Sequence, residues 1–527
     1  MAADAQVVVD MQNITKTFGK VVANHNVKLT LHKGEILALL GENGSGKTTL
    51  MNMLSGIYFP DSGTIEVNGK EVMIRSPKDA FDNGIGMIHQ HFLLVDVLTA
   101  AENIVLGLPG AATVDRKGIN GKVKELCDRY GFDIDPKRKI YNMAVSEKQT
   151  VEIMKVLYRG ADILILDEPT AVLTPQEVDK LFAVLRNMKK DGKSIIIITH
   201  KLNEVLAISD HVEILRKGEY IKTINTAEAD QQILTDAMVG HATSLAIERP
   251  QLERGPELLK VSNVTVLNNE KLKALDNVSF SAYGGEILGI AGISGSGQKE
   301  LCEAIAGLQH LTTGNIMFQE KNHQGKTLSD VNDRTPSERE KAGLTYVNLS
   351  FVPEDRLGMG LVGSMDMTDN CMLRSYRNNK GIFVDRKTPR ELAEKLIKEL
   401  EIVTPGVETP VRRLSGGNVQ KVLLGREIAG GPEVLVVSYP VRGLDINSSY
   451  KIYDLLNEQK KKGVAVIFVG EDLDVLLELS DRILVMCDGQ VSGILNAEDI
   501  AKPEAKANIG IYMIKVGGPD AKEEVRA

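Results

Sequence analysis

The sequence repeats itself, and this repeat constrains the fold more than any other feature. The segment Gly34–Gly46 (GEILALLGENGSG) recurs as Gly285–Gly297 (GEILGIAGISGSG). A later landmark, Met143–Glu147, has its counterpart at Leu414–Asn418, so the second copy is slightly longer between the two landmarks. Each copy spans about half of the chain, which is enough for a domain with its own core. The repeat therefore predicts two homologous domains in tandem.

Short apolar runs indicate the fold class of each copy. Ile36–Leu40, Ile163–Leu166, Ile195–Ile198 and Val464–Val469 are apolar throughout and are separated by amphipathic stretches with helical spacing. Runs of this length are typical of buried parallel strands, and their alternation with helices predicts an α/β fold. A membrane span needs about 20 apolar residues. Any work at a membrane is therefore expected to involve other subunits.

The domain boundaries follow from the repeat and from local composition. We expect a first domain over residues 7–245 and a second over residues 258–515. The intervening residues 246–257 are charged and interrupted by proline, which is typical of a short linker. Residues 516–527 are small and charged, and we expect a flexible tail there.

Composition excludes several classes of protein. The 527 residues carry a net charge of −8, so nucleic acid is not expected as the main partner. The four cysteines show no Cys-x-x-Cys spacing, which argues against a disulfide framework or a zinc site and fits a reducing, cytosolic compartment. Residues 1–10 contain no basic segment followed by an apolar one, so a signal peptide is not expected.

A phosphate-binding motif lies near the start of the first copy. Gly41-Glu-Asn-Gly-Ser-Gly-Lys47-Thr48 follows the expected strand 35–40 and opens an expected helix over 48–55. In such a P-loop the backbone N–H groups turn towards phosphate, the lysine reaches the β- and γ-phosphates and the threonine hydroxyl binds Mg²⁺. The expected ATP ligands are Gly41, Glu42, Asn43, Gly44, Ser45, Gly46, Lys47, Thr48 and Thr49.

An apolar strand ends in two carboxylates, Asp167 and Glu168. With a P-loop in the same domain, Asp167 is expected beside Mg²⁺, and Glu168 is expected to act as general base or to polarise the attacking water. Three further residues fit such a site. His200, after strand 195–198, can contact the γ-phosphate, although a structural histidine is the common alternative. Gln90 can bind Mg²⁺ or water, and Phe18 can stack on adenine or simply pack.

Taken in order, these motifs resemble those of ABC-type ATPases. The two fused halves are similar to the tandem ATPase subunits of bacterial importers for simple sugars and nucleosides, over about residues 7–515. The resemblance implies two P-loop ATPase domains, each with a mostly parallel sheet core, an antiparallel β subdomain and a helical signature subdomain. It also implies ATP and Mg²⁺ as cofactors. Gln90, Asp167, Glu168 and His200 then correspond to the Q-loop glutamine, the Walker B acid, the catalytic glutamate and the switch histidine.

The second copy has lost the reactive side chains of this set. Lys47 and Thr48 align with Gln298 and Lys299, and Phe18 aligns with Asn268 or Asn269. Without the lysine charge, nucleotide is expected to bind there more weakly. The carboxylates, the histidine and Gln90 are replaced by Ser438, Tyr439, Glu471 and Glu354. The residues expected to form this degenerate site are Gly292, Gly295, Gly297, Gln298, Lys299, Ser438, Tyr439 and Glu471.

The signature motif shows the reverse pattern. Ser415-Gly416-Gly417-Asn418 is intact in the second copy, where Ser415 is expected to cap a helix running to about residue 428. The first copy has Ala144 in place of the serine and Ser146 in place of the second glycine. In the family, nucleotide lies between one domain's P-loop and the other domain's signature. The resemblance therefore predicts one competent composite site and one degenerate site.

The resemblance also implies partners. Integral membrane permease subunits would bind residues 91–141, with contacts at His91-Phe92-Leu93-Leu94, although a core role for Phe92 is an equal alternative. An extracytoplasmic substrate-binding protein would act indirectly, and the chain would lie at the cytoplasmic face of the membrane. The relic loop 292–301 and the run 88–92 favour nucleosides over a monosaccharide such as ribose or galactose. A soluble tandem ATPase acting on ribosomes or DNA is a remote alternative.

Overall fold

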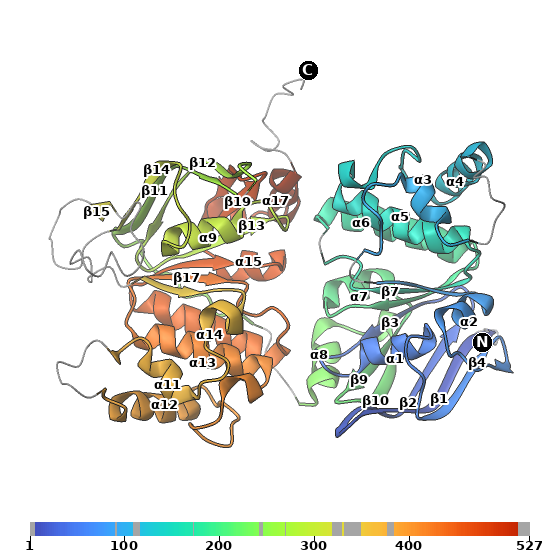
Figure 1. The fold of residues 1–527 in the computed structure, drawn as a ribbon, viewed down its shortest axis with the longest axis horizontal. Coiled ribbons are helices and arrows are strands. Elements are labelled where there is room, and N and C mark those ends of the chain that lie inside the picture. The colour runs from blue at the N-terminus through green and yellow to red at the C-terminus, as the bar shows by residue number, and fades with distance from the viewer. Residues whose placement is uncertain are drawn as a thin grey trace. The chain divides into compact units, whose positions relative to one another are not determined.

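The structure is a computed structural model, and its chain falls into two compact units, Met1–Leu245 and Ala246–Ala527 (Figure 1). Each unit has its own core. The residues that it describes are 6–89, 92–108, 116–171, 173–241, 246–268, 270–318, 329–330, 349–376 and 384–514.

Two sheets form the framework of the first unit. An antiparallel sheet has the order β2-β1-β4-β5, and a six-stranded sheet has the order β10-β9-β3-β8-β7-β6. The pairs from β9 to β6 are parallel, and β10 joins β9 in an antiparallel pair. The strands are β1 (Val7–Phe18), β2 (Val21–His32), β3 (Ile36–Leu40), β4 (Ser62–Val67), β5 (Lys70–Glu71), β6 (Ile85–Ile88), β7 (Ile163–Asp167), β8 (Ser194–Ile198), β9 (His211–Arg216) and β10 (Glu219–Asn225).

Helices cover both faces of the six-stranded sheet. Alternate residues of β7 pack on opposite sides: Ile163 and Ile165 meet α1 and the antiparallel sheet, whereas Leu164 and Leu166 meet α5 and α6. This two-sided burial explains why the strands are apolar throughout. The helices are α1 (Lys47–Leu54), α2 (Pro77–Asp82), α3 (Ala100–Val105), α4 (Arg116–Tyr130), α5 (Val145–Tyr158), α6 (Pro175–Lys190), α7 (Leu202–Ile208) and α8 (Gln231–Val239).

The second unit repeats this topology. Its antiparallel sheet has the order β12-β11-β14-β15, and its six-stranded sheet has the order β16-β17-β18-β13-β19-β20 with only the β19–β20 pair antiparallel. The strands are β11 (Glu257–Leu267), β12 (Lys273–Tyr283), β13 (Ile287–Gly292), β14 (Thr313–Phe318), β15 (Ser329–Asp330), β16 (Leu349–Val352), β17 (Val434–Ser438), β18 (Ala465–Val469), β19 (Arg482–Cys487) and β20 (Gln490–Leu495).

The helices of the second unit also lie on two sides of its large sheet. Helix α9 packs between this sheet and the antiparallel one, while α13 and α14 cover the opposite face (Figure 1). The helices are α9 (Gln298–Ala306), α11 (Met367–Met372), α12 (Lys387–Glu399), α13 (Gly416–Ala429), α14 (Ile446–Lys461), α15 (Leu473–Leu479), α16 (Ala497–Ile500) and α17 (Ala505–Ile514). The predicted α/β architecture, with a mostly parallel sheet and an antiparallel subdomain in each copy, is confirmed.

Unusual backbone conformations repeat together with the strands. Glu168 and its counterpart Tyr439 both have positive φ angles, 49° and 47°, immediately after a central strand. Lys217 and Asp488 form a second such pair, with 50° and 47°. Side chains rarely adopt this left-handed region. Its retention after the side chains changed shows that the two units share a backbone in detail.

The predicted linker lies along the second unit. Residues 246–256 form no helix or strand, but Ile247 packs against the core of that unit. Arg249 donates a hydrogen bond to the carbonyl of Ser480, and the Lys460 ammonium donates to the carbonyl of Pro250 at 2.5 Å.

No helix among the described residues has the length and apolar character needed to cross a membrane.

Candidate functional site

The P-loop of the first unit connects the buried strand β3 to helix α1. Gly46 precedes the helix with φ of 97°, and a Cβ on it would lie 2.5 Å from the carbonyl oxygen of Ala23. Only glycine fits this position. Neighbouring segments hold the loop: the Gly218 N–H donates to the Ser45 carbonyl at 3.1 Å, and the Asn24 amide donates to the Gly46 carbonyl at 3.3 Å. The loop is therefore fixed from two sides.

Lys47 lies folded over its own loop. Its ammonium donates hydrogen bonds to the carbonyl oxygens of Gly41 at 2.6 Å and Glu42 at 3.0 Å. Burial lowers the pKa of Lys47, although the charges of Glu168, Asp167 and Glu42 oppose this shift. An anion beside the ammonium would stabilise its charged form and give it a stronger hydrogen-bond acceptor.

The loop fits a phosphate group on structural grounds. The Ser45 hydroxyl is buried and makes no hydrogen bond to any part of the chain that the structure describes. Gly44 has φ of 82°, and open space surrounds the position where its Cβ would stand. A buried hydroxyl without a partner, a glycine-lined turn and a buried ammonium are what a bound phosphate requires.

Asp167 and Thr48 lie together at the carboxyl end of β7 and the start of α1. The Thr48 hydroxyl donates a hydrogen bond to the Asp167 carboxylate. Burial, followed by the nearby charge of Glu168, raises the pKa of Asp167 to about 6, against the opposing effects of Lys47 and Thr48. A carboxylate beside a hydroxyl provides the oxygen ligands that Mg²⁺ prefers. A divalent cation here would favour the ionised carboxylate.

Glu168 and His200 form a second pair at the same edge of the sheet. The Nδ1 atom of His200 lies 2.8 Å from Oε1 of Glu168. The other carboxylate oxygen of Glu168 is buried and has no hydrogen-bond partner within the described residues. Burial lowers the pKa of His200, but the hydrogen bond and the charge of Glu168 outweigh it, so the net pKa is raised. One fixed carboxylate oxygen and one unpartnered oxygen suit a group that orients water.

Phe18 and Gln90 are the remaining predicted site residues of the first unit. Phe18 is 42% exposed at the tip of the β1–β2 hairpin, where its ring meets Tyr58 edge to face with centroids 5.1 Å apart. The same hairpin carries Asn24, whose amide donates to the Gly46 carbonyl of the P-loop. Gln90 and the contact residue His91 lie outside the described residues. Asn269, one of the two counterparts of Phe18, also lies outside them.

The second P-loop keeps its framework and loses its charge. Gly297 has φ of 97°, like Gly46, and the Gly489 N–H donates to the Ser296 carbonyl at 3.1 Å, as Gly218 does to Ser45. Gln298 is buried, and its amide donates to the Ile293 carbonyl at 3.0 Å. The amide thus repeats one bond of the lysine without the ammonium. Lys299 has a 64% exposed side chain, paired with Glu303 at 3.8 Å.

Neutral or ion-paired side chains occupy the positions that correspond to the carboxylates and the histidine of the first unit. Ser438 is buried and shares a hydrogen bond with the Cys302 thiol. Tyr439 packs against the core of the second unit, and burial raises its pKa far above the physiological range. Glu471 forms an ion pair with Arg442 at 3.0 Å. Among the described residues of this cluster, no carboxylate oxygen is buried without a hydrogen-bond partner as in Glu168.

The signature of the second unit begins helix α13. Ser415 and Gly416 are exposed, and a Cβ on Gly417 would lie 2.9 Å from the Ser448 hydroxyl. Ser415 occupies the N-cap position, but the expected capping bond was wrong: its hydroxyl accepts from the Asn418 amide at 2.9 Å, not from a backbone N–H. The side chain of Asn418 competes successfully for this oxygen. The helix ends at Ala429, one residue beyond the prediction.

The corresponding turn in the first unit is capped in another way. Ala144 precedes α5, and the Glu147 carboxylate accepts a hydrogen bond from the Ala144 N–H at 2.8 Å. Arg138 forms an ion pair with Glu147 at 2.7 Å. The Glu147 carboxylate, paired with Arg138, thus caps this turn in place of a serine hydroxyl.

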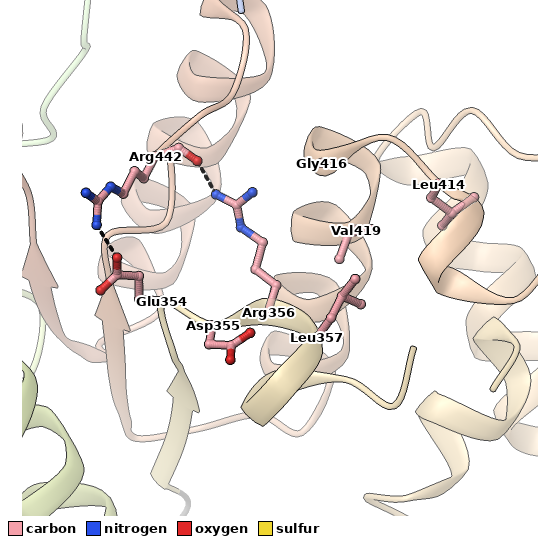
Figure 2. A pocket seen from close by; sticks show the side chains of 8 residues that line it. All are labelled: Glu354, Asp355, Arg356, Leu357, Leu414, Gly416, Val419 and Arg442. Atoms are coloured by element: carbon pink, nitrogen blue, oxygen red, sulfur yellow. Dashed lines mark hydrogen bonds and ion pairs between the residues drawn. The ribbon is translucent and has the colours of Figure 1, made fainter. Parts of the chain in front are cut away.

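The sequence analysis did not single out two arginines of the second unit, Arg442 and Arg356. Arg442 forms an ion pair with Glu471. It also contacts Glu354, and Arg356 donates a hydrogen bond to the backbone carbonyl of Arg442 (Figure 2). The repeat carried a signal for the first of them, because Arg442 replaces Ala171 of the first copy. A new cation beside two replaced catalytic positions would have indicated an ion network.

Comparison with known proteins identifies the class. The family model for ABC transporters matches residues 24–171 and 275–440, once in each unit. The chain therefore belongs to the ABC transporter family, whose ATPase domains bind ATP.

Close relatives cover nearly all of the chain. It is 39% identical to the glucose import ATP-binding protein TsgD13 of Haloferax volcanii, with 97% of this chain and 96% of the relative aligned. It is 40% identical to the nucleoside import ATP-binding protein NupA of Lactococcus lactis, with 97% and 98% aligned. It is 41% identical to the guanosine import ATP-binding protein NupO of Bacillus subtilis, with 99% of each aligned.

Proposed function

We propose that the chain is the ATP-hydrolysing, energy-coupling subunit of an ABC importer. The observation that carries this proposal is the cluster of Lys47, Thr48, Asp167, Glu168 and His200 around one P-loop. Full-length relatives named as import ATP-binding proteins support it.

Hydrolysis is assigned to the residues of this cluster. The backbone of Gly41–Thr49 and the ammonium of Lys47 bind the phosphates, and Phe18 stacks on the base. Thr48, Asp167 and Gln90 are the proposed ligands of Mg²⁺, which would neutralise phosphate charge when bound. Glu168 orients the attacking water and accepts its proton, while His200 fixes the Glu168 carboxylate and faces the γ-phosphate.

One competent site is proposed for each chain. It combines the Walker residues of the first domain with Ser415–Asn418 of the second, either within one chain or between two chains. The segregation of the motifs supports this, because each unit lacks what the other retains. The opposite combination would join Gln298, Ser438 and Tyr439 to the Glu147-capped turn, and we assign no hydrolysis to it. The domain limits 7–245 and 258–515 are part of the same proposal.

The transported substrate is proposed to be a nucleoside. Two relatives named for nucleoside and guanosine import support this class. The relative named for glucose import keeps a monosaccharide, such as ribose or galactose, as the second candidate. The proposed partners are integral permease subunits at the cytoplasmic face of the membrane and, indirectly, an extracytoplasmic substrate-binding protein. Nucleic acid is not a proposed partner.

The decisive experiment measures ATP turnover by the reconstituted transporter while its substrate is varied. The complex is assembled with its permease and binding protein, and a panel of nucleosides and monosaccharides is added in turn. Stimulation by guanosine or other nucleosides alone supports the first candidate, and stimulation by ribose or galactose alone replaces it with the second. Co-purification of the chain with ribosomes instead of membrane subunits would overturn the importer assignment.

The composite site has its own test. Ser415→Arg places a bulky cation at the signature of the domain that lacks Walker residues. We expect turnover to fall as severely as with Lys47→Ala, because both variants disrupt the same site. An assembled transporter that kept normal ATPase activity with Ser415→Arg would refute the composite site.

A further inference from the structure

Arg442 is the centre of an ion network in the second unit. Its guanidinium contacts the carboxylate of Glu354 through Nη1 and that of Glu471 through Nε, the latter at 3.0 Å. The same guanidinium lies 6.0 Å from the ring centroid of Tyr439. Glu354, Tyr439 and Glu471 align with Gln90, Glu168 and His200 of the first copy. The network therefore occupies the positions of the lost catalytic groups.

Arg356 connects this network to the signature helix. It donates a hydrogen bond through Nη2 to the backbone carbonyl of Arg442, and its side chain lies between that carbonyl and Gly416 (Figure 2). A Cβ on Gly416 would stand 3.5 Å from Nη1 of Arg356, so the guanidinium lies beside the first residue of α13. Arg356, Arg442 and Gly416 line a pocket of about 450 Å³. Leu357 and Leu414 contribute apolar walls to this pocket.

The segment that carries Arg356 is also fixed further along α13. Residues 356–360 form a single π-helical turn, and the Gly360 carbonyl accepts a hydrogen bond from Arg426 of α13 at 2.7 Å. Arg426 is buried and paired with Glu427. The segment thus lies against the helix at its start and is hydrogen-bonded to it at its third turn.

We propose that Arg442 and Arg356 are positioning residues for the competent ATP site. They fix the start of α13, and with it Ser415–Asn418, in the orientation needed to contact the γ-phosphate in the transition state. This inference rests on the composite site proposed above. Donors at such a site must be held in place before the reaction, because their value depends on small displacements. The degenerate half then has a specific task, which is to present the signature.

The first unit lacks this arrangement in its described part. Ala171 carries no charge, and the turn before α5 is held by Glu147 and Arg138. The Arg442 side chain is 54% exposed, and those of Glu354 and Glu471 are 37% and 47% exposed. Salt therefore screens these pairs, and the effect on turnover is expected to weaken as ionic strength rises.

The test measures kcat and KM for ATP in the assembled transporter with Arg442→Ala, Arg356→Ala and Arg442→Lys. For each alanine variant we expect kcat to fall by about tenfold with KM changed by less than about twofold, because the lost contacts act in the transition state. Arg442→Lys, which retains the charge but not the fork, should recover part of the loss. Arg390→Ala on α12 is the matched control, since its side chain is also 54% exposed and ion-paired.

A second measurement separates positioning from misfolding. ATP binding to the isolated chain should be unchanged in the two alanine variants, because the P-loop of the first unit is intact. Ser415→Arg serves as the reference. If it abolishes turnover while both arginine variants behave like Arg390→Ala, the positioning role is wrong and the composite site stands. If Ser415→Arg is also without effect, the proposed function fails first. A rise in KM with constant kcat would likewise overturn positioning.

Discussion

The two units differ in chemistry far more than in backbone. At the first P-loop a buried ammonium donates to the carbonyls of Gly41 and Glu42, and at the second a neutral amide, that of Gln298, donates to Ile293. Glu168 and Tyr439 share an uncommon positive φ, yet one is a carboxylate with an oxygen that has no partner among the described residues and the other is a packed ring. The change of side chains therefore left the backbone scaffold intact.

The comparison also shows what the active cluster imposes on its own unit. Burial opposes the charge of both Lys47 and Asp167, whereas their counterparts Gln298 and Ser438 are neutral. Charges held out of water destabilise a fold unless they are paired. We propose that the first unit retains these buried charges because they bind a charged nucleotide. The second unit has no such requirement, and the side chains at the matching positions are neutral or ion-paired.

The largest expected difference between the units lies in turnover. Glu168→Gln removes the proposed base and should lower kcat by roughly 10²- to 10⁴-fold while ATP still binds. Tyr439→Phe, at the matching position, should leave kcat within about twofold, because the ring packs and takes no part in the reaction. ATPase assays of the assembled transporter check both values. Comparable losses in the two variants would contradict the asymmetry.

A smaller difference should appear in the pH dependence of stability. The pKa of Asp167 rises from 3.8 to about 6 in the folded chain, so the folded state holds this proton more tightly than the unfolded state. The stabilisation is present below about pH 4 and is lost as pH rises through 6. Without nucleotide, Asp167→Asn should therefore raise the free energy of unfolding by about 2 kcal/mol at pH 8 and little at pH 4.

Denaturant unfolding at several pH values measures this effect. Ser438→Ala in the second unit is the control, and its effect on stability should not vary between pH 4 and pH 8, because neither residue titrates there. An Asp167→Asn chain no more stable than the original at pH 8 would show that the carboxylate is not strained.

Restoring the lost residues should make the second site bind but not react. The triple variant Gln298→Lys, Lys299→Thr and Ser438→Asp returns the charge and the proposed Mg²⁺ ligands. We expect nucleotide affinity at this site to rise by about tenfold, because charge-assisted hydrogen bonds to phosphate return. Turnover should stay unchanged, since Tyr439 supplies no base. Equilibrium dialysis with Mg²⁺ and ATP measures how much nucleotide each chain binds. If the triple variant binds no more nucleotide than the original chain, packing blocks the second site.

The smallest expected effect distinguishes the two kinds of helix start. The Ser415 hydroxyl accepts from Asn418 and caps no backbone N–H, so Ser415→Ala should change stability by less than about 0.5 kcal/mol. Asp445 caps α14 by accepting a hydrogen bond from the Ser448 N–H at 2.8 Å. Asp445→Ala should therefore lower the free energy of unfolding by about 1 kcal/mol. Thermal unfolding compares the two. Equal losses would mean that Ser415 contributes to the fold as well as to the proposed site.

The sequence predicted the fold because the physics behind it is local, and the roles given to the residues of the first cluster stay predictions. The apolar runs that became β3, β7, β8 and β18 are buried on both faces, and this burial requires an unbroken apolar pattern. A P-loop places Lys47 and Thr48 by covalent geometry alone. Parallel strands then bring Glu168 and His200 to the same sheet edge.

What the sequence did not predict depends on side-chain competition. The hydroxyl of Ser415 has two possible donors, a backbone N–H and the Asn418 amide, and only packing decides between them. The contact of Arg442 with both Glu354 and Glu471 joins three loops that are far apart in the chain. Residue types alone do not place such long side chains.

The docked segment 246–256 has a practical consequence for dissecting the protein. The Lys460 side chain is completely buried, and it relies on the Pro250 carbonyl together with Asp481, 2.7 Å away. A fragment that starts at residue 258, where the repeat itself begins, would strip one acceptor from that ammonium and expose the apolar surface beneath Ile247. Anyone expressing the C-terminal half by itself should cut the gene upstream of Ala246.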